Sequence, residues 1–377
     1  MKGRDFMGKR LVAALAAAFA FNATAEAQSI SVMVDADYAD FLLAKTCSHE
    51  EIDEAAVRAM PVVQSQVKHH ANLTGARDME AFLAGLNAAA KCEVPENDVY
   101  EFGPLVKEKK TFRAAVDYFK DRSADLEVYV AESLSPYVPA DVDYKGELVL
   151  SVVGNNCGGF AMDGRFYLAL SCIRDDVEGE FEAAKIMAAH ETFHALQYEF
   201  FYPFNEDISA VKSRNEAFDY LFMNLLTEGT AEFAASTKDV EGDGVLSGLT
   251  RRFARNGYRQ AAFHIRTFGY MADILNAGDD PVARLKDVYN LGFGGQNRQV
   301  FYYAGAVMAA HVDKTYGREA LICIVSKPPE QFVRAYEAAA RERADVNAPP
   351  LAPAMMKAAE RLSRKRAKDL HYERCIE

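Results

Sequence analysis

Residues 178–201 read EGEFEAAKIMAAHETFHALQYEFF, and the interpretation of the whole chain starts from this stretch. No Gly or Pro interrupts residues 180–202, and Pro203 then provides a stop. The apolar side chains of the stretch recur near helical spacing. Together these features predict one long amphipathic helix that ends close to the proline.

The predicted helix carries an HExxH pattern made of His190, Glu191 and His194. Positions i and i+4 lie on one face of a helix, so His190 and His194 can reach the same metal ion. Glu191 lies beside them, where it can hold and deprotonate a water on that ion. The alternative interpretation is a pair of surface histidines on an amphipathic helix.

Residues 214–236, which include the run NEAFDYLFMNLLTEGTAEFAAS, predict a second helix. Within it, Glu228 is the candidate third metal ligand, and Glu232 lies one turn further on the same face. Glu232 is then placed to accept the outer N–H of a ligating imidazole. Gly229 and Ala231 remove bulk, which predicts a close approach of the two helices. A solvated acidic face is the alternative interpretation of the two glutamates.

Two imidazoles, one carboxylate and an open position for water are typical of a catalytic zinc site rather than a closed structural one. The pattern therefore predicts one Zn²⁺ per chain. The HExxH pattern followed by Leu226–Phe233, LTEGTAEF, resembles the gluzincin metallopeptidases. The LxEGxAx-aromatic run is similar to the third-ligand helix of the aminopeptidase N-like family. The resemblance implies zinc bound by His190, His194 and Glu228, with Glu191 as general base.

A third piece of the resemblance lies downstream, in the run Tyr302-Tyr303-Ala304-Gly305. It resembles the YxxG segment of the aminopeptidase N-like family, whose tyrosine stabilises the tetrahedral oxyanion. By that spacing Tyr302 is the match, since a phenol can donate a hydrogen bond to developing negative charge. Tyr303 and His264 stay open as alternative donors, and purely structural tyrosines are the remaining interpretation.

The chain also departs from that family. It has no GxMEN run, the motif that holds a substrate's free amine, and Gly159–Asp163, GFAMD, is a poor match to it. His194 and Glu228 are 34 positions apart, a longer gap than in the aminopeptidases. The resemblance covers about residues 180–320 and is closer to secreted bacterial proteins described as zinc peptidases. Aminopeptidase activity is therefore not expected.

The first residues resemble a secretory signal. Residues 1–10 are basic on balance, residues 11–21 form an unbroken apolar run, and small residues follow up to Ala27, where cleavage is expected. Eleven apolar residues are too few to span a bilayer, which needs about twenty. We therefore expect an exported protein, periplasmic or extracellular, with no membrane contact after signal removal. A retained anchor is the alternative.

The formal net charge is −12, and removal of residues 1–27 takes away four basic and two acidic residues, which makes it −14. Phosphate contacts need clustered Lys and Arg. An acidic chain of this kind is not expected to bind nucleic acid.

An even number of cysteines in an exported chain favours disulfides, although six cysteines allow fifteen pairings. Proximity in the sequence favours the pairs 47–92, 157–172 and 323–375, and free buried thiols are the alternative. The six candidates are Cys47, Cys92, Cys157, Cys172, Cys323 and Cys375.

Two strands are expected before the HExxH helix, at residues 147–153 and 165–172. Asp163-Gly164 is a hairpin signal between them. In gluzincin-like folds the strand before the HExxH helix usually lies at the rim of the cleft. The resemblance therefore implies that the second strand can pair with an extended peptide substrate.

The predicted fold class is α+β and mainly helical: a gluzincin-like zincin domain with a small sheet beside the HExxH helix, preceded by a helical region. His69 and His70 in that region are adjacent, so they cannot act as an i, i+4 pair, and we interpret them as surface residues. The predicted divisions are a signal peptide at 1–27, a helical N-terminal region at 28–145, the metallopeptidase domain at 146–345 and a charged C-terminal tail at 346–377.

The sequence thus predicts a secreted zinc peptidase that acts on a peptide or protein substrate. A different class of function stays open: a periplasmic binding or chaperone-like protein with a degenerate or structural metal site. A zinc hydrolase acting on a non-peptide bond is the third hypothesis. Inhibition by hydroxamates would separate an open metal position from a closed one.

Overall fold

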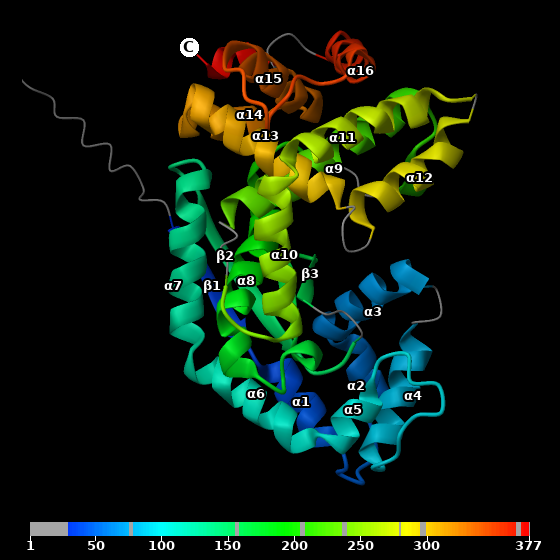
Figure 1. The fold of residues 1–377 in the computed structure, drawn as a ribbon. Coiled ribbons are helices and arrows are strands. Elements are labelled where there is room, and N and C mark those ends of the chain that lie inside the picture. Colours follow the sequence, from blue (N-terminus) through cyan, green and yellow to red (C-terminus); the bar gives the residue numbers. More distant parts are fainter. Residues whose placement is uncertain are drawn as a thin grey trace, which may run out of the picture.

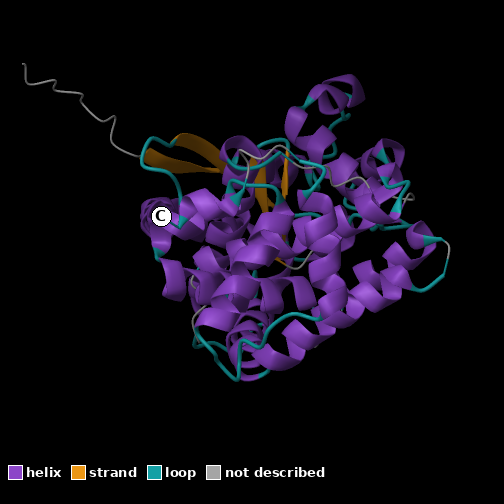
Figure 2. Cartoon of the chain, turned by 90° about the horizontal axis from the view of Figure 1, so that it is seen from above, coloured by secondary structure: helices purple, strands orange, loops and turns teal. Residues whose placement is uncertain are grey.

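The fold is α+β and mainly helical, with one small sheet, as the sequence predicts (Figure 2). The predicted signal peptide, residues 1–27, lies outside the described residues. The computed structural model describes residues 29–74, 78–154, 158–203, 208–235, 240–278, 280–294, 299–366 and 371–376.

The first half of the chain places a strand before a series of short helices and returns to the sheet after them (Figure 1). The strand at its start is missing from the sequence interpretation. The elements are β1 Ser29–Asp35, α1 Asp37–Lys45, α2 Glu54–Ala59, α3 Pro61–Thr74, α4 Met79–Ala90, α5 Phe102–Lys107, α6 Lys109–Asp121, α7 Ser123–Leu134, β2 Asp143–Ser151, β3 Gly158–Met162 and β4 Arg165–Ala169.

The second half is helical, and its C-terminal helices lie at the opposite end of the molecule from α1–α6 (Figure 1). Residues 245–276 form two helices that are separated by a break at Gln260. The elements are α8 Val177–Phe200, α9 Arg214–Ala234, α10 Val245–Arg259, α11 Ala261–Asn276, α12 Pro281–Phe293, α13 Val300–Tyr316, α14 Arg318–Val325, α15 Pro329–Glu342 and α16 Pro353–Ser363. Short 3₁₀ turns occur at Ser135–Tyr137, Leu170–Cys172, Ile208–Ala210 and Tyr372–Cys375.

The sheet has the order β1-β2-β4-β3. β1 pairs with β2 and β2 with β4 in parallel, whereas β3 and β4 form an antiparallel hairpin. The hairpin turns at Asp163 and Gly164, whose φ angles of 51° and 77° both lie in the left-handed region. This conformation is the one that Asp-Gly favours in a two-residue hairpin loop. The predicted turn is confirmed, and Met162 lies opposite Arg165 across it.

One expectation about the sheet is wrong. The strand predicted at 165–172 ends at Ala169, and as β4 it is flanked by β2 on one side and β3 on the other. Both of its hydrogen-bonding edges are used within the sheet, so it cannot pair with a peptide substrate. Among the described strands, β3 is the edge strand nearest the HExxH helix, and it packs directly against α8.

The interpretation of His69 and His70 as surface residues is also wrong. His70 is fully buried, and His69 stacks on Phe160 of β3 with ring centroids 3.8 Å apart. Burial lowers the pKa of His69 to about 4, so its ring is neutral at physiological pH. From the same helix, the Ser65 hydroxyl donates a hydrogen bond to Asp163. Helix α3 therefore covers the hairpin.

Apolar side chains form two buried cores. The first lies around the sheet and α1–α8, and the second lies among α9 and α11–α16. Helix α9 contributes to both, since Leu225 belongs to the second core and Ala231 to the first. The predicted HExxH helix packs on α9 at the junction of the two cores. The predicted boundary at residue 145 stays a prediction.

Gly229 permits a close helix contact, but with a different helix from the one expected. A Cβ on Gly229 would lie 2.2 Å from Cα of Gly305, on α13, and a Cβ on Gly305 would lie 2.3 Å from the carbonyl oxygen of Leu225. Such distances are far below van der Waals contact, so only glycine at both positions allows α9 and α13 to cross this closely. The crossing brings the YYAG run next to the LTEGTAEF run.

Two of the three predicted disulfides are confirmed. Cys47–Cys92 joins the ends of α1 and α4, and Cys323–Cys375 joins α14 to the C-terminal turn. The third predicted pair includes Cys157, which lies outside the described residues. Disulfides are typical of an oxidising, extracytoplasmic environment. Within the described ranges, no helix has both the length and the apolar character needed to cross a membrane.

Candidate metal centre

Helix α8 carries both histidines of the HExxH pattern in the middle of a 24-residue helix. The Asp176 side chain caps its first turn by accepting a hydrogen bond from the N–H of Gly179. His190 is buried at 7% exposure, and its ring lies edge-on to the ring of His194 with centroids 4.8 Å apart. The helix thus holds two imidazoles side by side in a mostly buried setting, as the spacing predicts.

Helix α9 brings the predicted third ligand to the same place. The Ser213 side chain caps its start. Glu228 Oε2 lies 3.5 Å from Nε2 of His190 and 3.3 Å from Nε2 of His194. Among the described residues, these three form the one group of three or more His, Cys, Asp or Glu side chains that could hold a metal ion. The structure therefore brings together the three residues that the sequence selects.

The spacing of these atoms fits a zinc ion. The two Nε2 atoms are 3.1 Å apart, so the three ligand atoms form a triangle with sides of 3.1, 3.3 and 3.5 Å. Ligands bound tetrahedrally at about 2.1 Å lie roughly 3.4 Å from one another. Oε2 of Glu228 is buried and makes no hydrogen bond of ordinary geometry within the described residues; it pairs only loosely with the two Nε2 atoms, at 3.3 and 3.5 Å. A buried carboxylate oxygen of this kind is costly unless a cation satisfies it.

The electrostatics of the three residues are strongly coupled. Burial alone would lower the pKa of His190, but the carboxylates of Glu228 and Glu232 outweigh it and raise that pKa to about 10. Burial alone would raise the pKa of Glu228, but the imidazoles of His194 and His190 lower it to about 2. Burial alone would also lower the pKa of His194, but the carboxylates of Glu228 and Glu191 raise it above the ordinary value. Without a metal, the site therefore keeps a proton where the ion would bind.

Glu232 faces the outer side of His190. Its Oε2 lies 3.6 Å from Nδ1 of His190, and its side chain is only 12% exposed. One turn of α9 separates it from Glu228, so the two carboxylates face the two nitrogens of the same ring. This arrangement directs Nε2 of His190 towards Glu228.

Sequence reasoning missed Gln197, which has the corresponding place beside His194. Its Oε1 lies 2.8 Å from Nδ1 of His194, and the side chain is 4% exposed. It lies three positions after His194, and therefore on the same face of α8. A polar residue on the buried face of a helix is the signal that could have identified it.

Tyr302 reaches the cluster from α13. Its ring stacks on that of His190 with centroids 5.9 Å apart and an angle of 19° between the planes. Burial raises its pKa well above the ordinary value, and the nearby charges of Glu228 and Glu191 add to this effect. The phenol therefore keeps its proton and can act as a hydrogen-bond donor. The negative charge of Glu191 also raises the pKa of His190, His194 and Tyr302, so its carboxylate lies within electrostatic range of all three.

The two alternative donors lie together. His264 and Tyr303 face each other with ring centroids 4.5 Å apart, and the Tyr303 hydroxyl is 3.4 Å from Oε1 of Gln299. Burial lowers the pKa of His264 to about 4, so this ring is neutral. The structure thus brings Tyr302 into ring contact with a predicted ligand and leaves Tyr303 and His264 packed against one another.

Comparison with curated proteins and with solved structures finds no significant match. A family model does match the chain, over residues 8–345. This range contains every residue of the cluster and nearly the whole described fold. The chain therefore belongs to the family DUF5700, whose description is "putative zinc dependent peptidase".

Proposed function

We propose that this protein is an exported zinc peptidase of the gluzincin type, with His190, His194 and Glu228 as zinc ligands. The observation that carries the proposal is the triangle of ligand atoms, with sides of 3.1–3.5 Å, contributed by two adjacent helices. Membership of a family described as zinc dependent supports the choice of metal. A bound zinc ion supplies Lewis acidity towards a carbonyl oxygen and lowers the pKa of a water.

The side chains around the ligands have separate roles in this proposal. Glu191 accepts a proton from the attacking water and passes it to the leaving amine. The Tyr302 phenol, which keeps its proton because its pKa is raised, donates a hydrogen bond to the oxygen that gains negative charge. Glu232 orients His190 through the outer nitrogen of the ring.

We further propose that the peptide substrate lies along β3. This strand is at the end of the sheet order and packs against α8, the helix that carries His190 and Glu191. An edge strand offers unpaired N–H and C=O groups to an extended chain. Gly158 and Gly159 occupy its first positions, where a Cβ on Gly159 would meet the Tyr167 carbonyl oxygen of β4 and one on Gly158 would lie 3.4 Å from Met187, so the glycines let β3 pack closely against β4 and α8.

The proposal is tested by metal content and by cleavage of a peptide library. Purified protein, dialysed against trace zinc, should retain about one zinc per chain and cleave library peptides. A chelator should abolish cleavage, added zinc should restore it, and a hydroxamate should inhibit it. A folded protein that retains no zinc would exclude the proposal, whereas zinc binding without cleavage or hydroxamate inhibition would favour the binding-protein alternative.

Tyr302→Phe should lower kcat by about 10²–10³-fold with little change in zinc affinity, because the variant loses only the hydrogen-bond donor. Tyr303→Phe is the matched control on the neighbouring residue, and it should retain near wild-type activity. Steady-state kinetics on one cleaved peptide measure both. If Tyr303→Phe lost activity while Tyr302→Phe kept it, the assignment of the oxyanion donor would be wrong.

A further inference from the structure

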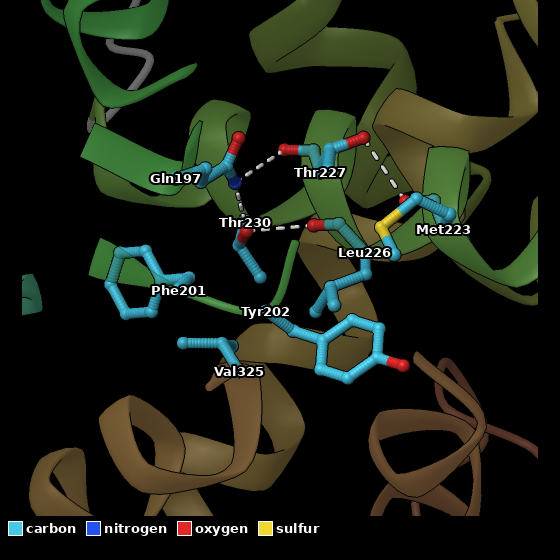
Figure 3. A pocket seen from close by; sticks show the side chains of 8 residues that line it. All are labelled: Gln197, Phe201, Tyr202, Met223, Leu226, Thr227, Thr230 and Val325. Atoms are coloured by element: carbon cyan, nitrogen blue, oxygen red, sulfur yellow. Dashed lines mark hydrogen bonds between the residues drawn. The ribbon is translucent and has the colours of Figure 1, made fainter. Parts of the chain in front are cut away.

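The amide of Gln197 lies between the two helices that supply the candidate zinc ligands (Figure 3). Its Nε2 donates hydrogen bonds to the carbonyl oxygen of Thr227 at 2.9 Å and to Oγ1 of Thr230 at 2.8 Å, both on α9. Its Oε1 lies 2.8 Å from Nδ1 of His194, on its own helix. One buried side chain therefore connects His194 to the turn of α9 that carries Glu228.

The hydrogen-bond partners of Gln197 determine which terminal atom of its amide is the nitrogen and which is the oxygen. The Thr227 carbonyl can only accept, so the NH₂ group must face it. The Thr230 hydroxyl donates its own proton to the Leu226 carbonyl at 2.7 Å, so it too acts as an acceptor towards Gln197. A flipped amide would place its oxygen against two acceptors. Oε1 must therefore face His194.

This orientation decides where His194 carries its proton. An amide oxygen only accepts, so the 2.8 Å contact requires N–H at Nδ1 of His194. In the neutral ring the lone pair is then on Nε2. Nε2 is the atom that lies 3.1 Å from Nε2 of His190 and 3.3 Å from Oε2 of Glu228. Gln197 thus presets His194 to bind a metal through Nε2.

We propose that Gln197 is a positioning residue that sets the tautomer of His194 and couples it to the helix of Glu228. The inference rests on the proposed zinc site and adds the device that presets it. His190 and His194 then differ in their outer partners, since a carboxylate faces Nδ1 of His190 and an amide faces Nδ1 of His194. A carboxylate at position 197 would have no N–H to donate and would meet the Thr227 carbonyl oxygen, so glutamine meets both requirements.

The surroundings of Gln197 determine which substitution tests this role. The side chain lines a small pocket whose wall includes Phe201, Met223 and Val325 (Figure 3). Alanine at 197 would enlarge the pocket and admit water, and water can replace a lost hydrogen-bond donor or acceptor. Methionine has a similar length, fills the space and makes no comparable hydrogen bond.

Gln66→Met is the matched control. Gln66 is as buried as Gln197, at 1% exposure, and its amide is equally well bonded. It accepts from the Tyr38 hydroxyl and donates to the Val153 carbonyl at 2.9 Å and to Ser151 Oγ at 3.3 Å. Both variants should lose thermal stability, because each leaves buried polar atoms without partners. Only Gln197→Met changes the surroundings of the zinc ligands.

The experiment measures the zinc dissociation constant by competition with a chromophoric chelator. We expect Gln197→Met to weaken zinc binding by about 10–100-fold and Gln66→Met to leave it unchanged. Equal dissociation constants for Gln197→Met and the wild type would overturn the inference. If the wild type itself bound no zinc, the proposed function would fail instead, so the two failures are distinguishable.

A measurement on the unmutated protein covers the case in which Gln197→Met does not fold. In zinc-loaded protein labelled with ¹⁵N-histidine, the ring nitrogen shifts of His194 should show a proton on Nδ1 and metal on Nε2. A spectrum with metal on Nδ1 and the proton on Nε2 would overturn the inference without any substitution.

Discussion

Glu191→Gln should lower kcat/KM for peptide hydrolysis by about 10²–10⁴-fold while the protein keeps its zinc. The physical reason is that glutamine has nearly the shape of glutamate but cannot take up a proton. Glu191 directly follows His190, a candidate ligand, and its charge acts on both histidines and on Tyr302. It is not one of the three ligands that form the 3.1–3.5 Å triangle, so its neutralisation leaves the zinc site complete.

Two assays on one preparation check this prediction: zinc per chain by elemental mass spectrometry, and cleavage of a peptide found in the library screen. Glu199→Gln is the matched control, because Glu199 lies on the exposed part of the same helix and the charge change is identical. The control should cleave at the wild-type rate. Undiminished cleavage by Glu191→Gln would refute the proposed general base.

Features set by local spacing could be predicted from the sequence. The helix around His190 is predicted by apolar residues that recur at helical spacing without an intervening Gly or Pro. The i, i+4 spacing then places both imidazoles on one face. The hairpin follows in the same way from Asp163-Gly164, which favours left-handed backbone at both positions. The helix and the hairpin each depend only on residues close together in the sequence, and the structure contains both elements.

Features that depend on distant partners could not be predicted. β1 pairs in parallel with β2, and seven helices lie between them in the chain. A parallel pair leaves no turn signal at either strand. The central place of β4 in the sheet is also a result of long-range pairing, because β2, and β1 beyond it, pair on the β4 side of the hairpin. This is why the strand expected at the substrate cleft was the wrong one.

The glycine and glutamine positions show the same limit at the site. The sequence indicates that Gly229 allows a close contact, but not that the partner is Gly305 on α13 rather than α8. Gln197 is a single polar residue in an apolar run, and its role depends on two threonines thirty or more positions away. The candidate ligands could be selected from the sequence because few residue types bind zinc, whereas a glutamine amide can have many roles.

Replacing a residue that contacts only the outer nitrogen of a ligand is expected to weaken zinc binding by about 10–100-fold. Glu228→Gln should weaken it by more than this. The substitution removes the one charged ligand in the set, and Oε2 of Glu228 is the atom that lies within 3.5 Å of both Nε2 atoms. Glu232→Gln is the matched control, one turn along α9 with the same change of charge. Its effect should stay within the smaller range, because Glu232 faces only the outer nitrogen of His190. Equal losses for both variants would contradict the assignment of Glu228 as third ligand.

The number of protons released on zinc binding provides a second test of the role of Glu228. In the metal-free wild type the pKa of His190 is raised to about 10, so at neutral pH zinc must displace a proton from this ring. The raised pKa stabilises the metal-free fold fully below the ordinary value of 6.5, and this contribution is lost as pH rises through about 10. Because zinc competes with this proton, zinc affinity should increase with pH from neutrality and level off above about pH 10.

Calorimetry in two buffers of different ionisation enthalpy should show at least one proton released per zinc at pH 7.5. In Glu228→Gln the release should be smaller, because one of the two carboxylates that hold the proton on His190 is gone; an affinity independent of pH between about 6 and 9 would contradict this account of the site.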